Sequence, residues 1–392
     1  MKRVLHVMAS LERSGMEQML LSSATEWHAA GYTCDVVSTA PEVGPAAEAM
    51  RECGYGVYHL PFRSKHRLLP RAGFMREFYR LCAQGYDVVH IQVEAGRPLF
   101  ALIARMAGVR RLAVTPHSTF RFTGLLRMRK MAERHLIRLL GGRFGMISES
   151  VQKCEWERFR IRGERIWNWI NSDYFRPPTA EERSLARKEL GLEGAGFVVV
   201  SVANCSHVKN HPALLEALAL LHEDERPVYL HVGREEEGQP ERRLAEQLRI
   251  TGTTCFVGSQ PDPRSYFWAA DAVVMPSLYE GVGLSAIEAV ACGLPLVCTR
   301  IDGLRDLARE METCIMTSTD PEAIADGLRE VMRQKPEEQK TRGQRDSARI
   351  REMYSLKNGV ASVIENLYSE RRKVDVRTPR VERELKSSAL NR

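Results

Sequence analysis

The chain has 392 residues, of which 44% are hydrophobic and 27% charged, and its formal net charge is +7. This length exceeds what one hydrophobic core usually serves, so two domains are expected. No apolar run approaches the roughly 18–20 residues of a membrane-spanning helix, and the short N-terminal apolar stretch, interrupted by His6, does not predict a signal peptide.

Short apolar runs alternate with helical patterns along the first half of the chain. Strands are predicted at residues 3–8, 36–38, 56–60, 86–92 and 112–115, and helices from residue 16 and at residues 41–53 and 97–107. Such alternation predicts a parallel sheet covered by helices on both faces. We expect a first Rossmann-like domain, the acceptor domain, over residues 1–175.

A second alternating series follows a break at Pro177 and Pro178 and a charged helix that ends at Gly191. Strands are predicted at residues 197–202, 228–232, 255–257, 272–275 and 295–298, with helices at residues 211–221, 241–248, 263–270 and 284–292. The fold class is therefore α/β, with two Rossmann-like domains facing across a cleft. The second domain is expected over residues 176–370, and residues 371–392 are expected to be a basic, disordered tail.

Positive charge and cysteines bear on partners and on cellular compartment. Residues 1–175 carry 26 Lys and Arg against 16 Asp and Glu, whereas the remainder carries 31 against 34. An anionic acceptor or partner surface on the first half would explain this, and so would a well-solvated surface. Nine scattered cysteines without a CxxC pair predict reduced thiols in the cytoplasm rather than disulfides or a zinc site.

The strongest motif begins where the strand at residues 272–275 ends. Gly281 and Gly283 allow the backbone to approach a ligand closely. The helix that starts at Leu284 presents free N–H groups and the positive end of its dipole, which together favour an anion. An anionic ligand is therefore expected beside this loop.

Two carboxylates flank that helix start. Glu280 precedes the helix and Glu288 lies roughly 12 Å further along it at helical rise. Two exposed glutamates would be the ordinary interpretation, but carboxylates at this spacing can also bind hydroxyls at both ends of a sugar nucleotide. With its flanking PS-x-x-EG-x-G and ACG-x-P, the segment resembles the E-x7-E signature of the family-four retaining GT-B glycosyltransferases (glycosyl transferases group 1), particularly those of bacterial capsule and exopolysaccharide synthesis.

The resemblance implies a role for each glutamate and for a lysine upstream. Glu280 would face the transferred sugar and Glu288 would bind the ribose hydroxyls. Lys209, in a loop after a predicted strand, would bind the diphosphate, although a surface lysine is the alternative. The family usually has Arg-x4-Lys here, and Asn204 takes the arginine position. His207 or Arg234 could supply the missing phosphate contact.

Further matches complete the expected donor site. Arg234 follows a strand-end V-G turn, and Val257 lies in the segment whose backbone pairs with the nucleobase in the family. In the first half, residues 13–17 resemble a GG-x-E loop, of which Gly15 and Glu17 match and Ser14 replaces the first glycine. His117 resembles the histidine of a TxHG segment that contacts the donor sugar, although a lone histidine is more often structural. The expected catalytic residues are Glu280, His117 and Lys209, and the expected donor-binding residues are Gly15, Asn204, Lys209, Arg234, Val257, Glu280, Gly281, Gly283, Leu284 and Glu288.

A basic stretch at residues 121–143 intersperses apolar residues with arginines and a lysine. It could lie on an anionic membrane, with Arg127, Lys130 and Arg134 facing the lipid, or pack its apolar side on the sheet. Another basic cluster, residues 63–71, lies in the same domain. No recognised nucleic-acid-binding module is present, so no nucleic acid is expected as a partner.

The resemblance implies retention of configuration, a nucleotide-diphosphate sugar donor, with a UDP-sugar expected, and an acceptor of unknown kind. No cofactor and no metal are expected, because no DxD-like acidic pair is available to bridge a magnesium ion to the diphosphate. The expected location is the cytoplasm, or the inner face of the membrane. Two alternatives stay open: another GT-B enzyme such as a sugar-nucleotide epimerase or a phosphorylase, and a non-catalytic basic protein that binds membrane or nucleic acid.

Overall fold

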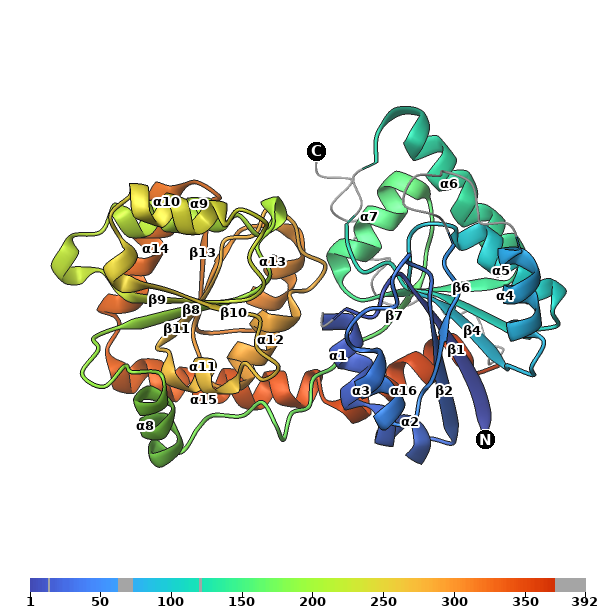
Figure 1. Ribbon diagram of the computed structural model, residues 1–392, viewed down its shortest axis with the longest axis horizontal. Coiled ribbons are helices and arrows are strands. Elements are labelled where there is room, and N and C mark those ends of the chain that lie inside the picture. The colour runs from blue at the N-terminus through green and yellow to red at the C-terminus, as the bar shows by residue number, and fades with distance from the viewer. Residues whose placement is uncertain (13–14, 63–72, 120–121, 371–392) are drawn as a thin grey trace, which may run out of the picture.

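The computed structural model describes residues 1–12, 15–62, 73–119 and 122–370 (Figure 1). Arg13, Ser14, the basic cluster at residues 63–71, Arg121 and the expected tail at residues 371–392 lie outside the described residues. The described chain forms two α/β units, each built on one parallel sheet. This is the architecture that the alternating pattern predicted.

The first sheet has the strand order β3-β2-β1-β4-β5-β6-β7 and is parallel throughout. Its strands are β1 (Lys2–Met8), β2 (Tyr32–Ser38), β3 (Gly56–His59), β4 (Val88–Ile91), β5 (Arg111–Val114), β6 (Gly142–Met146) and β7 (Glu164–Arg165). Its helices are α1 (Gly15–Ser22), α2 (Ala24–Ala29), α3 (Ala47–Glu52), α4 (Phe74–Cys82), α5 (Arg97–Met106), α6 (Gly124–Leu139) and α7 (Glu149–Phe159). The order reverses between β1 and β4, which makes the loops after these strands neighbours at the switch point.

The second sheet has the order β10-β9-β8-β11-β12-β13, again parallel. Its strands are β8 (Val198–Val202), β9 (Val228–Val232), β10 (Thr254–Gly258), β11 (Ala272–Met275), β12 (Leu296–Thr299) and β13 (Cys314–Thr317). The helices in this half of the sequence are α8 (Ala180–Glu189), α9 (His211–Ala219), α10 (Pro240–Gln247), α11 (Arg264–Ala269), α12 (Leu284–Ala291), α13 (Asp302–Ala308), α14 (Pro321–Arg333), α15 (Pro336–Met353) and α16 (Leu356–Val363). Short 3-10 turns are η1 (His207–Lys209), η2 (Glu223–Glu225) and η3 (Thr251–Thr253), and a π-helical turn, η4 (Ile364–Tyr368), ends the described chain.

Helices cover both faces of the second sheet. Figure 1 shows α9, α10 and α14 above it and α11, α12 and α15 below it. Its strands are continuous apolar runs, such as β11, all four residues of which are buried. Strands buried on both faces need such runs, because both of their faces meet helices rather than water.

The end of the described chain returns to the first domain. Helix α15 runs beneath the second sheet, and α16 and η4 then pack on α2 and on β5, β6 and β7 of the first sheet (Figure 1). The hydroxyl of Tyr368 is hydrogen-bonded to His90 Nδ1 at 2.7 Å, deep in that core. This packing differs from the expected assignment of all residues 176–370 to the second domain. A parallel bridge between Ile170 and Ser355 joins the segment that leaves the first domain to the segment that returns to it.

Candidate active site

A cavity of about 760 Å³ lies between the two domains. It is formed where the loops after β1 and β5 face the loops after β8 and β11, so both sheets contribute the carboxyl ends of their strands. Of the expected site residues, those that line it are Gly15, His117, Asn204, Lys209, Glu280, Gly281, Gly283, Leu284 and Glu288. One continuous cavity therefore brings together residues from both halves of the sequence.

The glycines of the β11–α12 loop set how closely the two domains approach. A Cβ on Gly281 would lie 2.0 Å from the carbonyl oxygen of His117, so a side chain there would push the domains apart. Gly283 adopts φ +80° as the N-cap of α12, a conformation that other residues adopt only with strain. The loop thereby points the N-terminus of α12 into the cavity, and its first N–H groups can face an anion.

Lys209 and Glu280 form an ion pair beside that helix start. Lys209 Nζ lies 2.5 Å from Glu280 Oε1, which also accepts a hydrogen bond of 3.0 Å from Ser277 Oγ. Because β8 and β11 are adjacent strands, the loops that carry the lysine and the glutamate emerge side by side. The sequence interpretation gave these residues separate ligands and did not anticipate their contact, which only the sheet order reveals.

Glu288 lies about one turn into α12, half-buried at the cavity wall. Its removal from water raises the pKa of the carboxyl from 4.5 to about 8, and the negative charge of Asp262 adds to this effect. A carboxyl group in such a place is ready to exchange hydrogen bonds with hydroxyl groups. It is poorly suited to stand alone as a charge.

His117 belongs to a chain of hydrogen-bonded polar side chains, of which His6 is buried and His117 and Gln92 are partly buried. Its Nε2–H donates to Gln92 Oε1 at 3.1 Å, and Gln92 Nε2 donates to His6 Nδ1 at 2.8 Å. Burial, with a contribution from the Arg97 cation, lowers the pKa of His117 to about 4, and burial lowers that of His6 to about 3. The imidazole at the cavity is therefore neutral at physiological pH, and Gln92 determines which of its nitrogens carries the proton.

Two expected donor-binding residues lie outside the cavity lining, and a third uses its side chain in the fold. Arg234 extends toward solvent and lies 3.9 Å from Glu12. The carbonyl of Val257 accepts a hydrogen bond from Gln260 Nε2 at 3.1 Å. Asn204 Oδ1 accepts from the backbone N–H of Arg234 at 2.9 Å, so this side chain joins two strand-end loops.

Helix α6 corrects the expectation that Lys130 and Arg134 face a membrane. Both are buried, because each has carboxylate partners on the inner side of the helix. Arg134 forms a two-pronged pair with Glu155, at 2.7 and 2.9 Å, and Lys130 lies 2.9 Å from Glu133. The exposed face of α6 is instead apolar and basic: Leu125, Leu126, Met128, Leu136 and Leu139 are exposed, as are Arg127, Arg129 and Arg138.

No helix in the described ranges is both long and apolar enough to cross a membrane. All nine cysteines lie in the described residues, and none of them forms a disulfide.

The cavity as a whole combines a cation, a helix N-terminus and two carboxyl groups. The lysine and the helix start suit the oxygens of a phosphate group, and the carboxyl groups suit hydroxyls. The neutral imidazole adds a nitrogen that can exchange a hydrogen bond without a charge. This set fits a ligand that carries both phosphate and sugar.

Sequence comparisons agree with this chemistry. A family model described as Glycosyltransferase Family 4 matches residues 13–173, and one described as Glycosyl transferases group 1 matches residues 182–347. The Bacillus subtilis protein EpsF, described as a glycosyltransferase, is 25% identical over 309 residues, which are 76% of this chain and 78% of EpsF. A D-inositol 3-phosphate glycosyltransferase of Corynebacterium urealyticum is 33% identical, but the match spans only 40% of each chain.

Solved structures show the same fold. The Anabaena protein Alr3699/HepE, crystallised with UDP and glucose, superposes with a TM-score of 0.78 at 17% identity, over 94% of this chain and all of that one. A glycosyltransferase from Rickettsia africae superposes with a TM-score of 0.75 at 18% identity, over 93% and 97% of the two chains. The architecture of two facing Rossmann-like domains is therefore confirmed.

Proposed function

Because this chain belongs to the group 1 glycosyltransferases, we propose that it transfers a hexose-type sugar from a nucleotide-diphosphate sugar to an acceptor in glycan or glycolipid synthesis. A UDP-sugar is the proposed donor, and retention of the anomeric configuration is proposed from the resemblance of the E-x7-E segment. The observation that carries the proposal is the Lys209–Glu280 pair beside the N-terminus of α12, inside the interdomain cavity.

The donor would lie along α12. The ribose hydroxyls would bind Glu288, the diphosphate would meet the first N–H groups of the helix and Lys209, and the sugar would lie against Glu280 and His117. Each ligand group then meets the protein group that suits its chemistry. Metal ions are not needed in this arrangement, because the helix start and the lysine supply positive charge to the diphosphate.

The reaction would use the same contacts to stabilise the leaving group. When the bond between the anomeric carbon and the diphosphate oxygen breaks, negative charge grows on that oxygen. Lys209 is held by Glu280 before the donor arrives, so it is already oriented toward the place where this charge develops. Donor binding would divide the lysine's hydrogen bonds between Glu280 and phosphate. Closure of the cleft would exclude water and favour transfer over hydrolysis.

A panel of nucleotides and nucleotide sugars tests the proposal. A ligand that binds the folded state raises the melting temperature, so thermal shift identifies the base and the sugar. Product analysis with the best donor then gives transfer or slow hydrolysis. The proposal fails if no nucleoside diphosphate or nucleotide sugar shifts the melting temperature of the folded protein.

We also propose that the exposed face of α6 contacts an anionic membrane surface. Leu125 is 89% exposed and Leu139 84% exposed, at opposite ends of the helix, and arginines lie between them. Apolar side chains with neighbouring cations are typical of helices that lie in a bilayer interface. Binding to vesicles should require anionic lipid, weaken with salt and fall when both leucines are changed to Gln. Lys153→Gln, on the exposed face of α7, is the control. Equal binding of the double-leucine variant and wild type would refute this contact.

A further inference from the structure

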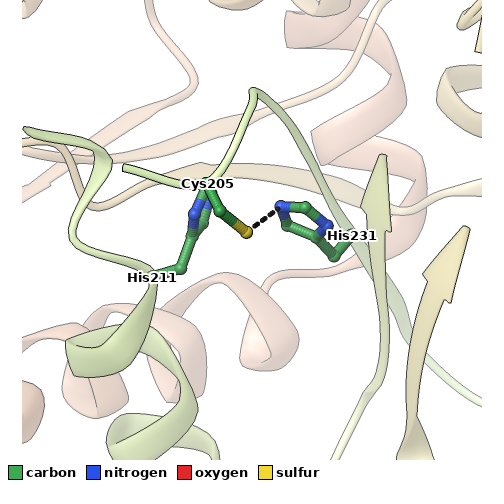
Figure 2. A group of neighbouring side chains, drawn as sticks. All are labelled: Cys205, His211 and His231. Atoms are coloured by element: carbon green, nitrogen blue, oxygen red, sulfur yellow. Dashed lines mark hydrogen bonds between the residues drawn. The ribbon is translucent and has the colours of Figure 1, made fainter. Parts of the chain in front are cut away.

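A cluster of one thiol and two imidazole side chains lies at the loop that carries Lys209. Cys205 comes from that loop, His211 is the first residue of α9, and His231 lies in β9 (Figure 2). The thiol and one ring nitrogen of each histidine all lie within 4.8 Å of one another. Cys205 Sγ and His231 Nε2 are 3.4 Å apart. None of the three lines the interdomain cavity, whereas their neighbours Asn204 and Ser206 do.

The cluster is buried and incompletely hydrogen-bonded. Cys205, His211 and His231 are 7%, 2% and 0% exposed. The Nδ1 atom of His211 has no hydrogen-bond partner among the described residues, and neither has Oε2 of Glu241, a residue that is 5% exposed. Glu241, the second residue of α10, interacts with the Cys205 thiol. Buried polar atoms normally have partners, so the missing ones call for an explanation.

We propose that Cys205, His211 and His231 bind a zinc ion, with Glu241 as the fourth ligand. One thiolate, two imidazoles and a carboxylate are ligands that zinc takes in tetrahedral sites. Zinc–ligand distances of about 2.0–2.3 Å place ligand atoms roughly 3.3–3.7 Å apart in a tetrahedron. The Cys205–His231 distance of 3.4 Å already fits, and the other separations among Cys205, His211 and His231, all within 4.8 Å, would close by at most about 1 Å.

Zinc coordination would replace the present contacts among Cys205, His211 and His231. The two imidazoles now meet edge to face, with ring centroids 4.6 Å apart, and the thiol shares a hydrogen bond. On binding, Cys205 would release its proton and coordinate as thiolate, and both histidines would coordinate as neutral rings. The ligands come from four separate segments, namely the loop after β8, α9, β9 and α10, so no short sequence motif predicts them.

The ion would stabilise the loop that presents Lys209 to the cavity. Cys205 lies four residues before Lys209 and His211 two residues after it, so coordination would tie both sides of this loop to β9. The ion would have no contact with the donor and would act only by positioning. This role is separate from the proposed transfer reaction, and the site stands or falls by metal binding alone.

Metal content tests the site directly. Protein expressed with zinc and purified without a chelating column should carry equimolar zinc by mass spectrometry of the metal. Cobalt substitution should give the absorption of a thiolate–cobalt bond. Cys205→Ser and His231→Gln should lose both signals, whereas Cys82→Ser, which changes a buried cysteine of α4 in the other domain, should keep them. Trace zinc in wild type, or undiminished zinc in Cys205→Ser, would overturn the proposal.

A second measurement does not depend on the stability of the variants. Wild type stripped with a strong chelator and then titrated with zinc should show saturable one-to-one binding and a rise in melting temperature. The absence of both from stripped protein that still has its secondary structure would make the cluster a packing contact. Glu241→Gln should weaken zinc binding without abolishing it, because Cys205, His211 and His231 remain as ligands.

Discussion

Replacing Glu288 with glutamine should stabilise the ligand-free protein at alkaline pH and lower its affinity for nucleotides. The pKa of this carboxyl is about 8, against an ordinary value of 4.5. The unfolded chain therefore releases the proton at lower pH than the folded protein does. The penalty for holding a desolvated carboxylate begins near pH 4.5, grows as pH rises and is complete above about pH 8. The neutral amide of the variant would not carry that penalty.

The size of the effect follows from the two pKa values. Their difference corresponds to roughly 5 kcal/mol, at about 1.4 kcal/mol for each pH unit, as an upper limit. Glu288 lines a cavity and is only half-buried, so water will relieve much of this cost, and we expect about 1–3 kcal/mol. That range raises the melting temperature of a domain of this size by about 2–4 °C for each kcal/mol.

Melting curves of wild type and Glu288→Gln at pH 5 and pH 9 measure this effect. The variant should gain little at pH 5 and the full amount at pH 9, and Glu189→Gln, on the exposed end of α8, should gain nothing at either. Calorimetry with a nucleoside diphosphate at pH 9, where the wild-type carboxyl is ionised, should show a loss of about 1.5–3 kcal/mol in the variant, because a charged hydrogen-bond acceptor for the ribose is gone. Equal melting shifts at both pH values would refute the reasoning about burial, and unchanged nucleotide affinity would refute the ribose contact.

Three further variants and one metal-dependence assay test the other contacts of the cavity. Lys209→Ala should lower both nucleoside diphosphate affinity, measured by calorimetry, and turnover, measured by initial rates. Glu280→Gln should lower turnover with the sugar donor and leave nucleoside diphosphate affinity nearly intact. The reverse pattern would mean that the donor binds in the opposite orientation. Activity should be full without added magnesium or manganese, and an absolute requirement for either would contradict the proposed role of α12 and the lysine. Gln92→Ala should lower turnover about 10-fold or more with nucleoside diphosphate affinity retained, because His117 loses the acceptor that fixes its tautomer; an unchanged rate would make His117 a structural residue.

Elements with strong local signals could be predicted from the sequence. The strand Ala272–Met275 and the helix beginning at Leu284 were both predicted from an apolar run, a turn and two glycines. Strand β6 was missed, because its sequence GRFGM has two glycines and no β-branched residue. It forms a strand because β5 and β7 pair with it, and that pairing is tertiary information.

Partners far apart in the sequence could not be predicted. The pairs Lys209–Glu280 and Arg134–Glu155 join residues 71 and 21 positions apart, and nothing in either segment alone announces the partner. For Arg134 this mattered most, since a basic residue on an amphipathic helix is ordinarily solvated. The carboxylates of Glu155 in α7 and of Glu94 reverse that expectation. The individual site residues on strand-end loops were easier to predict, because in a parallel α/β fold these loops all lie at the carboxyl edge of the sheet.

The return of the chain to the first domain has a consequence for synthesis. Tyr368 closes the core around Trp27, with ring centroids 5.9 Å apart, yet about 340 residues separate the two in order of translation. The second domain holds all six of its strands before that point and can fold while the ribosome is still working. The first domain is translated earlier, but part of its core stays uncovered until α16 and η4 have been synthesised. We therefore expect the domain made first to be completed last, and a chain arrested before residue 356 to present an unfinished apolar surface to chaperones.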